Sequence, residues 1–307
     1  MNGAWVAGSV RAQAMARRRL GVTAARALGR SASLTEALAA LAASPYGRHV
    51  RLAAGLAAAQ HGVLDALLWN LRVLAGWLPP AGVRSLRALA GWFEIANVDE
   101  HVAQLTGRAA EEPFRLGVLG SAWPRLSETG SRPEVRRALA ASAWGDPGSD
   151  DPSDISLTMR VAWARRVVSQ VDQAVPWALG ATGLLVAGHV HDAGGRLPET
   201  AARGVDALLG PEWAHARDLA DLCDRLPARA RWVLTDVHRP EQLWHAEAAW
   251  WRRLHTDGSR LIAGGRFGPD RPIGAVALLA ADAWQVRAAL ALAARTDVEQ
   301  EDADVLA

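Results

Sequence analysis

Apolar residues recur along the chain at the three- and four-residue spacing of an α-helix. No segment sustains the alternation of apolar and polar residues that is typical of a half-buried strand. The pattern therefore predicts an all-α protein with about 10–13 helices. We expect the longer helices at residues 10–29, 49–77, 82–105, 156–175, 177–191, 212–226, 239–256 and 273–295.

Local signals predict where some of these helices begin and end. Ser33 and Glu36 stand in the capping-box relation at the start of a short helix. That helix should stop at the turn 44–47, Ser-Pro-Tyr-Gly. Residues 145–154 are rich in Gly, Pro, Ser and Asp, and Pro152 is expected to keep them a loop.

A weak internal repeat runs through the chain. Three times, over residues 33–125, 133–210 and 212–295, a short helix leads through a turn into a longer helix. A spacing of about 90 residues is longer than the helical-solenoid repeats of about 34–47 residues. We therefore expect three similar helical modules, at 1–128, 129–210 and 211–307, with the C-terminal helix packed near the first.

The charged residues narrow the possible chemistry. All 34 basic residues are arginine, and 32 acidic residues leave a formal net charge of +2. The missing lysine excludes Schiff-base and P-loop chemistry, and the small net charge argues against a dedicated nucleic-acid binder. The single cysteine, Cys223, excludes an internal disulfide and is expected to be a buried, inert thiol.

Two apolar stretches raise the question of a membrane span. Residues 52–78 and 273–294 are long enough, but both carry charged side chains that a bilayer disfavours. We expect both to be buried amphipathic helices. No long apolar run precedes the first arginines, so no signal peptide is predicted and a cytoplasmic location is expected.

One acidic string suggests an enzyme. Asp150, Asp151 and Asp154 fit the D-D-x-x-D pattern with which isoprenoid synthases hold magnesium and a diphosphate. That chemistry needs the carboxylates on a helix, whereas a loop is expected here, so we predict exposed aspartates that do not converge with other carboxylates. No histidine or cysteine pair has a third partner at metal-ligand spacing, and we predict no metal or cofactor.

Arginines and tryptophans supply candidate partner contacts. Most of the 14 tryptophans are expected to pack in the core or between helices, and Trp69 and Trp92 are among the candidates. Adjacent residues point to different faces of a helix, so one ring of the pair Trp250 and Trp251 should be exposed beside Arg252. Arg17 and Arg18 are further candidates for contact with an acidic partner.

Four stretches of the chain are similar to one family. They are 9–12 (Ser-Val-Arg-Ala) with the turn 44–47, 93–98 (Phe-Glu-Ile-Ala-Asn-Val), 118–120 (Val-Leu-Gly), and 267–274 (Phe-Gly-Pro-Asp-Arg-Pro-Ile-Gly) with the closing helix 281–295. In this order they resemble the C-subunit family of the V/A-type rotary ATPases, which is equivalent to the d subunit of the eukaryotic V-type ATPase. The resemblance covers the N-terminal third and about the last 50 residues.

The resemblance implies a non-catalytic socket. Three helical modules with pseudo-threefold symmetry would form a funnel that links the central shaft subunits to the membrane proteolipid ring in proton or sodium transport. One copy would lie on the cytoplasmic face of the membrane, without a span of its own. A helical adaptor of the same fold that has lost this role is the alternative. The matched residues would be structural: Tyr46, Glu94, Asn97, Phe267 and Gly268.

Overall fold

The computed structural model describes residues 3–50, 55–109, 111–264 and 267–305, with side chains as far as residue 295. Within them the chain is 73% helical and forms no strand, which confirms the all-α prediction. The α-helices are α1 (Val6–Arg17), α2 (Val22–Leu28), α3 (Leu34–Ala42), α4 (Leu56–Ala75), α5 (Pro80–Leu105), α6 (Trp123–Leu126), α7 (Arg132–Ala140), α8 (Pro152–Gln170), α9 (Val175–Val186), α10 (Glu199–Leu209), α11 (Leu219–Arg225), α12 (Ala228–Arg231), α13 (Leu243–Ala263) and α14 (Asp270–Val305). Short 3-10 segments are η1 (Gly3–Trp5), η2 (Gly117–Leu119), η3 (Asp172–Ala174), η5 (Pro211–His215) and η6 (Pro240–Gln242), and η4 (Ala187–Asp192) is a π-helical turn.

The chain divides into two compact units. Unit 1 comprises Met1–Pro79 and Leu254–Ala307, and unit 2 comprises Pro80–Arg253. Both boundaries between the predicted modules, at 128/129 and 210/211, fall inside unit 2. The division into three modules stays a prediction, while the C-terminal helix α14 does pack with α1–α4 of the N-terminal segment.

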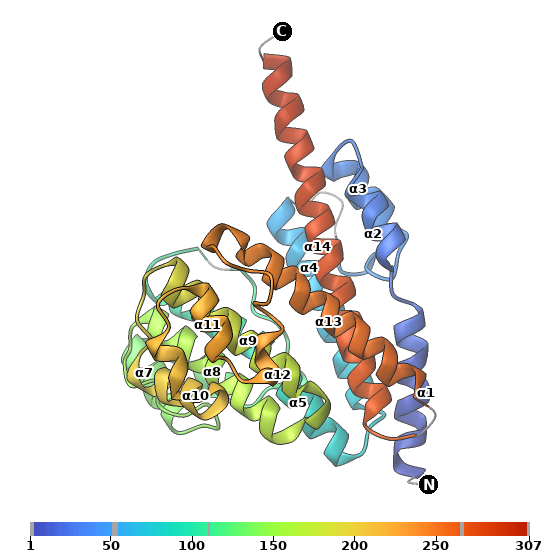
Figure 1. The fold of residues 1–307 in the computed structure, drawn as a ribbon. Helices are drawn as coiled ribbons and strands as arrows, with labels where there is room; N and C mark the ends of the chain where they lie inside the picture. Colours follow the sequence, from blue (N-terminus) through green and yellow to red (C-terminus); the bar gives the residue numbers. More distant parts are fainter. Residues whose placement is uncertain (1–2, 51–54, 110, 265–266, 306–307) are drawn as a thin grey trace. The chain divides into compact units, whose positions relative to one another are not determined.

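Unit 1 is built around α14, which packs against α1, α2, α3 and α4 (Figure 1). Among the described residues, Asp270–Arg295 is long and apolar enough to cross a membrane, with a mean hydropathy of 1.4. Within this helix, 61% of the most apolar stretch is buried inside the protein. The four surrounding helices account for its apolar composition, because α14 must bury more than one face. Gly258 of α13 and Gly274 of α14 let two backbones meet, since a Cβ on Gly274 would lie 2.8 Å from the Gly258 carbonyl oxygen.

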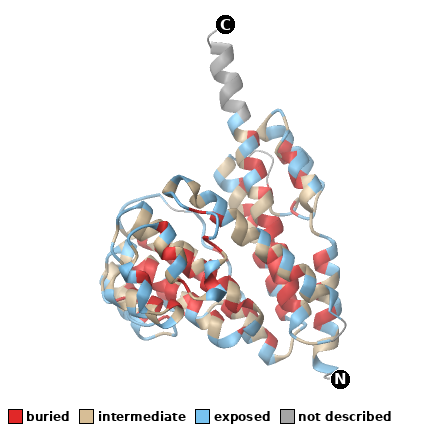
Figure 2. Cartoon of the chain, viewed as in Figure 1, coloured by how far each residue is buried: buried red, intermediate tan, exposed pale blue. Residues whose placement is uncertain are grey.

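Unit 2 has its own core. Helix α5 packs along α8, and α8 also contacts α9 and α10. The buried residues gather on the facing sides of these helices (Figure 2). A second part of this core joins α9, α10, α11 and α12 through residues such as Val186, Val205, Leu222 and Val233.

The start of α8 differs from the sequence prediction. The loop expected over 145–154 ends early, because Pro152 occupies the first turn of α8. Proline suits that position, since its missing N–H would have no partner within the helix in any case. Asp151 is the N-cap residue, and its side chain accepts hydrogen bonds from the N–H groups of Ser153 and Asp154.

Candidate functional site

The buried Glu94 carboxylate ties three segments of unit 2 together. It is 1% exposed and belongs to α5. The N–H groups of Ala122 and Trp123 donate to it at 2.6 Å, and the N–H and hydroxyl of Ser121 donate to it as well. The indole of Trp144 adds a fifth donor at 3.1 Å. Glu94 therefore caps the start of α6 and holds the turn after α7.

Asp282 has the corresponding place in unit 1. It is 2% exposed on α14 and accepts hydrogen bonds from the N–H groups of Leu20 at 3.0 Å and Gly21 at 2.7 Å, directly before α2. The hydroxyl of Tyr46 donates to it at 2.8 Å. Burial raises the pKa of Tyr46, and the nearby charge of Asp282 raises that pKa further. The carboxylate thus joins α14, the start of α2 and the turn after α3.

Asn97 is buried one turn after Glu94 on α5. Its side-chain amide donates to the Phe114 carbonyl at 2.9 Å and accepts from the Phe114 N–H at 2.7 Å. The Phe93 and Phe114 rings pack edge to face with centroids 5.1 Å apart. Asn97 therefore fixes an irregular connection against α5, because a buried backbone segment needs partners for its N–H and C=O groups.

Three short helices, α3, α7 and α11, share one hydrogen-bond contact at their starts. In each, the acid at the third helical position accepts a hydrogen bond from the N–H of the residue before the cap. The pairs are Glu36 with Ala32 at 2.7 Å, Glu134 with Gly130 at 2.8 Å, and Asp221 with Arg217 at 3.1 Å. In each case the contact ties the chain that enters the helix to the first helical turn.

The turn after the capped helix also recurs. Ser44 and Ser142 each donate a hydroxyl hydrogen bond to a helix carbonyl and accept, at 3.1 Å, from the N–H of Tyr46 or Trp144. These two aromatic residues are the ones that reach Asp282 and Glu94. After α11 and α12, Trp232 packs on α9 instead, where a Cβ on Gly180 would lie 2.7 Å from its ring.

The sequence reasoning did not identify this motif, although a signal for it is present. Ser33, Glu36, Ser44, an aromatic residue and glycine recur 98 residues later at 131, 134, 142, 144 and 145. Aligning the two turns alone would have paired Tyr46 with Trp144. The carboxylates that bind them could not be found in this way, because they lie on helices far away in the chain.

The aspartates of the D-D-x-x-D string lie at the start of α8. Asp151 is exposed and accepts the N–H of Ser153 at 2.8 Å and of Asp154 at 3.3 Å. Asp150 precedes the cap, and Asp154 lies in the first helical turn. Both are half-buried, so the prediction that all three aspartates are exposed is wrong for these two. No group of three His, Cys, Asp or Glu side chains in the described part of the chain is placed to hold a metal ion. The geometry gives Asp151 a capping function.

The tryptophan pair on α13 differs from the prediction that one ring is exposed. Trp250 and Trp251 are both half-buried, with their rings edge to face and centroids 4.8 Å apart. The Trp250 indole donates to the Trp177 carbonyl at 2.8 Å, which fixes it against α9. Arg252 is exposed, and its Nε donates to the Ala248 carbonyl at 3.4 Å.

Other tryptophans are the exposed ones. Trp69 and Trp92 are 40% and 47% exposed, so neither lies in the core. Trp92 does pack between helices, because its ring meets that of Trp163 on α8 edge to face at 5.7 Å. The most exposed are Trp77 at 51% and Trp244 at 65%. Arg160 lies 4.8 Å from the Trp92 ring centroid, so a guanidinium group covers part of this ring.

The other residues singled out in the sequence differ in their exposure and contacts. Phe267 is 37% exposed beneath Arg271, whose guanidinium lies 4.8 Å from the ring centroid. The Gly268 carbonyl accepts a hydrogen bond of 3.4 Å from Ser9. Cys223 is half-buried rather than buried, and burial raises the pKa of its thiol. Arg17 and Arg18 are exposed at the end of α1.

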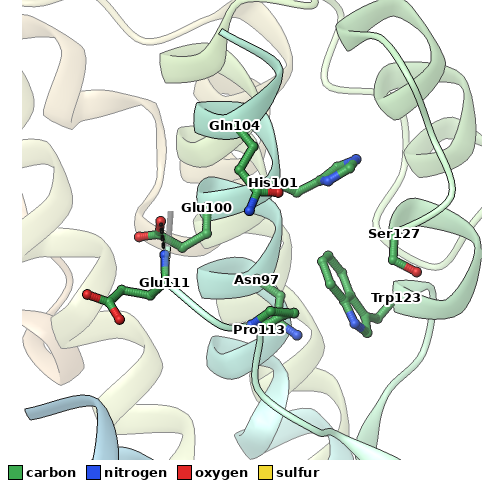
Figure 3. A pocket seen from close by; sticks show the side chains of 8 residues that line it. All are labelled: Asn97, Glu100, His101, Gln104, Glu111, Pro113, Trp123 and Ser127. Carbon is green, nitrogen blue, oxygen red and sulfur yellow. Dashed lines mark hydrogen bonds between the residues drawn. The ribbon is translucent and has the colours of Figure 1, made fainter. Parts of the chain in front are cut away.

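A cavity of about 120 Å³ opens beside Asn97 in unit 2 (Figure 3). Glu100 accepts the Glu111 N–H at 3.3 Å across one side, and the His101 and Trp123 rings meet edge to face at 6.1 Å on the other. Its lining is Asn97, Glu100, His101, Gln104, Glu111, Pro113, Trp123 and Ser127. Two carboxylates, Glu100 and Glu111, belong to this lining.

Comparison with known proteins does not assign a family. No protein-family model matches the chain, and no curated protein matches its sequence.

Proposed function

We propose that this chain is a non-catalytic central-stalk component of a V/A-type rotary ATPase. It would serve as a socket between the central shaft subunits and the membrane proteolipid ring in proton or sodium transport. The observation that carries the proposal is the threefold recurrence of one capped helix, at Glu36, Glu134 and Asp221. Three copies of one local design suit three modules, 1–128, 129–210 and 211–307, arranged with pseudo-threefold symmetry as a funnel.

The buried carboxylates support the same function. A socket that passes torque needs helices that resist sliding, and a carboxylate with several donors joins helices strongly because charge-assisted hydrogen bonds are stronger than neutral ones. Glu94 holds α5, α6 and the turn after α7 together, and Asp282 does the same for α14, α2 and the turn after α3. All these donors come from the chain itself, so the two carboxylates brace the scaffold.

Capture from native membranes tests this proposal. An affinity-tagged chain is expressed at its natural level, the membranes are dissolved in a mild detergent, and captured proteins are identified by mass spectrometry. We expect ATPase catalytic subunits, shaft subunits and proteolipid in fixed proportion, with one copy of this chain per complex. An untagged strain controls for adhesion to the resin.

A functional readout complements the capture. Deleting the chain should uncouple ATP hydrolysis from ion transport in membrane vesicles, and re-expression should restore coupling. A monomer recovered without these partners from cells that contain a rotary ATPase would contradict the proposal and favour the adaptor alternative. Turnover of an allylic diphosphate that depends on Asp150, Asp151 and Asp154 would favour an isoprenoid-synthase-like enzyme.

A further inference from the structure

The N-terminal end of unit 1 is strongly and one-sidedly charged. The first 35 residues contain six arginines and no acidic residue. Four of these arginines, Arg17, Arg18, Arg26 and Arg30, are exposed, and none of their side chains makes an ion pair or hydrogen bond within the described residues. We call these four the N-terminal arginine face.

The arginine face flanks the connection between α1 and α2, whose backbone is held by hydrogen bonds. Arg17 ends α1 and Arg18 caps it, while Arg26 lies in the last turn of α2 and Arg30 follows the end of that helix. Between the two helices, Asp282 binds the N–H groups of Leu20 and Gly21. Because the backbone between α1 and α2 is already fixed, it loses less conformational entropy when a ligand binds, and this favours binding.

Two carboxylates of unit 1 that bind at the starts of α2 and α3 are already engaged. Asp282 is 2% exposed, and its oxygens accept from two backbone N–H groups and from Tyr46. Glu36 accepts from the Ala32 N–H at 2.7 Å in its capping box. Because the four arginines are exposed, their positive charge can attract an anionic partner.

The outer surface of α1 continues the face with small apolar residues. Ala7, Val10 and Ala14 are exposed, Val10 by 54%, and their spacing places them on the same side of the helix as Arg17 and Arg18. Small side chains let a second helix approach closely and pack ridge into groove. They offer little apolar surface for insertion into a bilayer, which favours a protein partner over a lipid one.

We infer that the N-terminal arginine face binds an acidic amphipathic helix of a partner protein. The apolar side of that helix lies along Ala7, Val10 and Ala14, and its aspartate or glutamate carboxylates reach Arg17, Arg18, Arg26 and Arg30. Arginine suits this contact because its planar fork of donors matches a carboxylate in pairs. The inference rests on these residues alone and is independent of a place in a rotary ATPase.

Peptide binding to the full chain tests the inference. The probe is a fluorescein-labelled synthetic peptide of about 20 residues, long enough to be helical, with alanine and leucine on one face and glutamate on the other. A peptide of the same composition in scrambled order has the same charge but no apolar face. Fluorescence anisotropy at physiological salt measures the affinity of the chain for each of the two peptides.

Two charge-matched variants locate the contact. The first is R17Q/R18Q/R26Q/R30Q, and the second removes exposed arginines of unit 2 that make no ion pair among the described residues, R84Q/R108Q/R125Q/R229Q. Four exposed ion pairs of a few tenths of a kcal/mol each predict about a tenfold weaker binding for the first variant. The control should stay within about twofold of the unaltered chain, and circular dichroism confirms that both variants fold.

A third variant, A14E, adds a negative charge to the α1 stripe and should also weaken peptide binding while leaving the arginines in place. Equal binding of the scrambled peptide, or equal loss in both arginine variants, would overturn the inference, because either result means non-specific charge attraction. So would binding of the chain to phosphatidylglycerol vesicles through the same four arginines without binding of the peptide, which would identify a membrane as the occupant.

Discussion

The Tyr46 hydroxyl donates a 2.8 Å hydrogen bond to the Asp282 carboxylate, across 236 residues of sequence. In unit 2, the Trp144 indole makes the same kind of contact with Glu94 at 3.1 Å, across 50 residues. In both cases an aromatic donor, from a turn after a short capped helix, meets a buried carboxylate on a long helix. The carboxylate also binds backbone N–H groups at the start of the preceding short helix, α2 or α6, so one side chain holds three segments.

The first prediction concerns alkaline pH. The pKa of Tyr46 is raised in the folded protein, so the unfolded chain loses this proton more easily. The resulting stability is complete below the unfolded pKa of about 10 and declines as the pH rises above it. Tyr46 is the single tyrosine and the chain has no lysine, so tyrosinate absorbance should appear together with unfolding.

Tyr46→Phe separates this effect from other causes of alkaline unfolding. The variant should be less stable at pH 7 by about 1–3 kcal/mol, because a buried carboxylate loses a donor. Its stability in urea should then change less between pH 9 and about 11 than that of the unaltered chain. Early tyrosinate absorbance in the folded chain, at an ordinary pKa, would contradict the prediction.

The second prediction concerns the centre of unit 2. Glu94→Ala leaves the donors of Ser121, Ala122, Trp123 and Trp144 unpaired and should lower the free energy of unfolding by about 3–5 kcal/mol, the range found when one partner of a buried charged contact is removed. Trp144→Phe removes one donor and should cost about 1–3 kcal/mol. Urea denaturation measures both.

Exposed Glu128 provides the control for Glu94. Glu128→Ala removes the same charge from the surface and should change stability by less than about 0.5 kcal/mol. If Glu94→Ala and Glu128→Ala lowered the free energy of unfolding by similar amounts, the Glu94 carboxylate would not be what holds these segments of unit 2 together.

The third prediction uses two glycines at α4. A Cβ on Gly62 would collide with the carbonyl oxygen of His49, so Gly62→Ala should destabilise the protein by about 1–3 kcal/mol or more. At Gly76, the C-cap, the nearest atom to such a Cβ is the Val73 carbonyl oxygen at 3.4 Å. Gly76→Ala should be neutral or stabilising by up to about 1 kcal/mol. Thermal unfolding of the two variants measures the difference. Equal changes in melting temperature would refute the close approach of Gly62 to the His49 carbonyl.

The fourth prediction distinguishes a helix cap from a metal site at Asp151. Asp151→Ala should lower stability by about 0.5–2 kcal/mol, whereas Asp151→Asn, which keeps an acceptor, should cost less. Added Mg²⁺ should leave the melting temperature of the unaltered chain where it was. A rise in that temperature with Mg²⁺ that vanishes in Asp151→Asn would instead indicate a metal bound by the aspartates.

Local sequence predicted several elements correctly. The helical spacing of apolar residues predicted an all-α chain, and the N-cap was found where expected, with Ser33 accepting the Glu36 N–H at 3.1 Å. The other half of the predicted capping box differs, since Glu36 binds the N–H of Ala32 instead of that of Ser33. These features depend on neighbours within one or two turns, so a short stretch of sequence contains what decides them. Pro152 was misinterpreted because proline both breaks helices and begins them, and only its position in the first turn separates the two outcomes.

Contacts between distant segments could not be predicted in the same way. Nothing near Tyr46 in the sequence indicates Asp282, and nothing near Trp92 indicates that its helix leaves the ring 47% exposed. Burial and pairing are decided by which faces of the helices meet. The sequence by itself therefore determined the helices, their caps and the all-arginine charge. Only the tertiary structure decided which carboxylates became buried caps and which arginines stayed unpaired, because these outcomes depend on packing between distant helices.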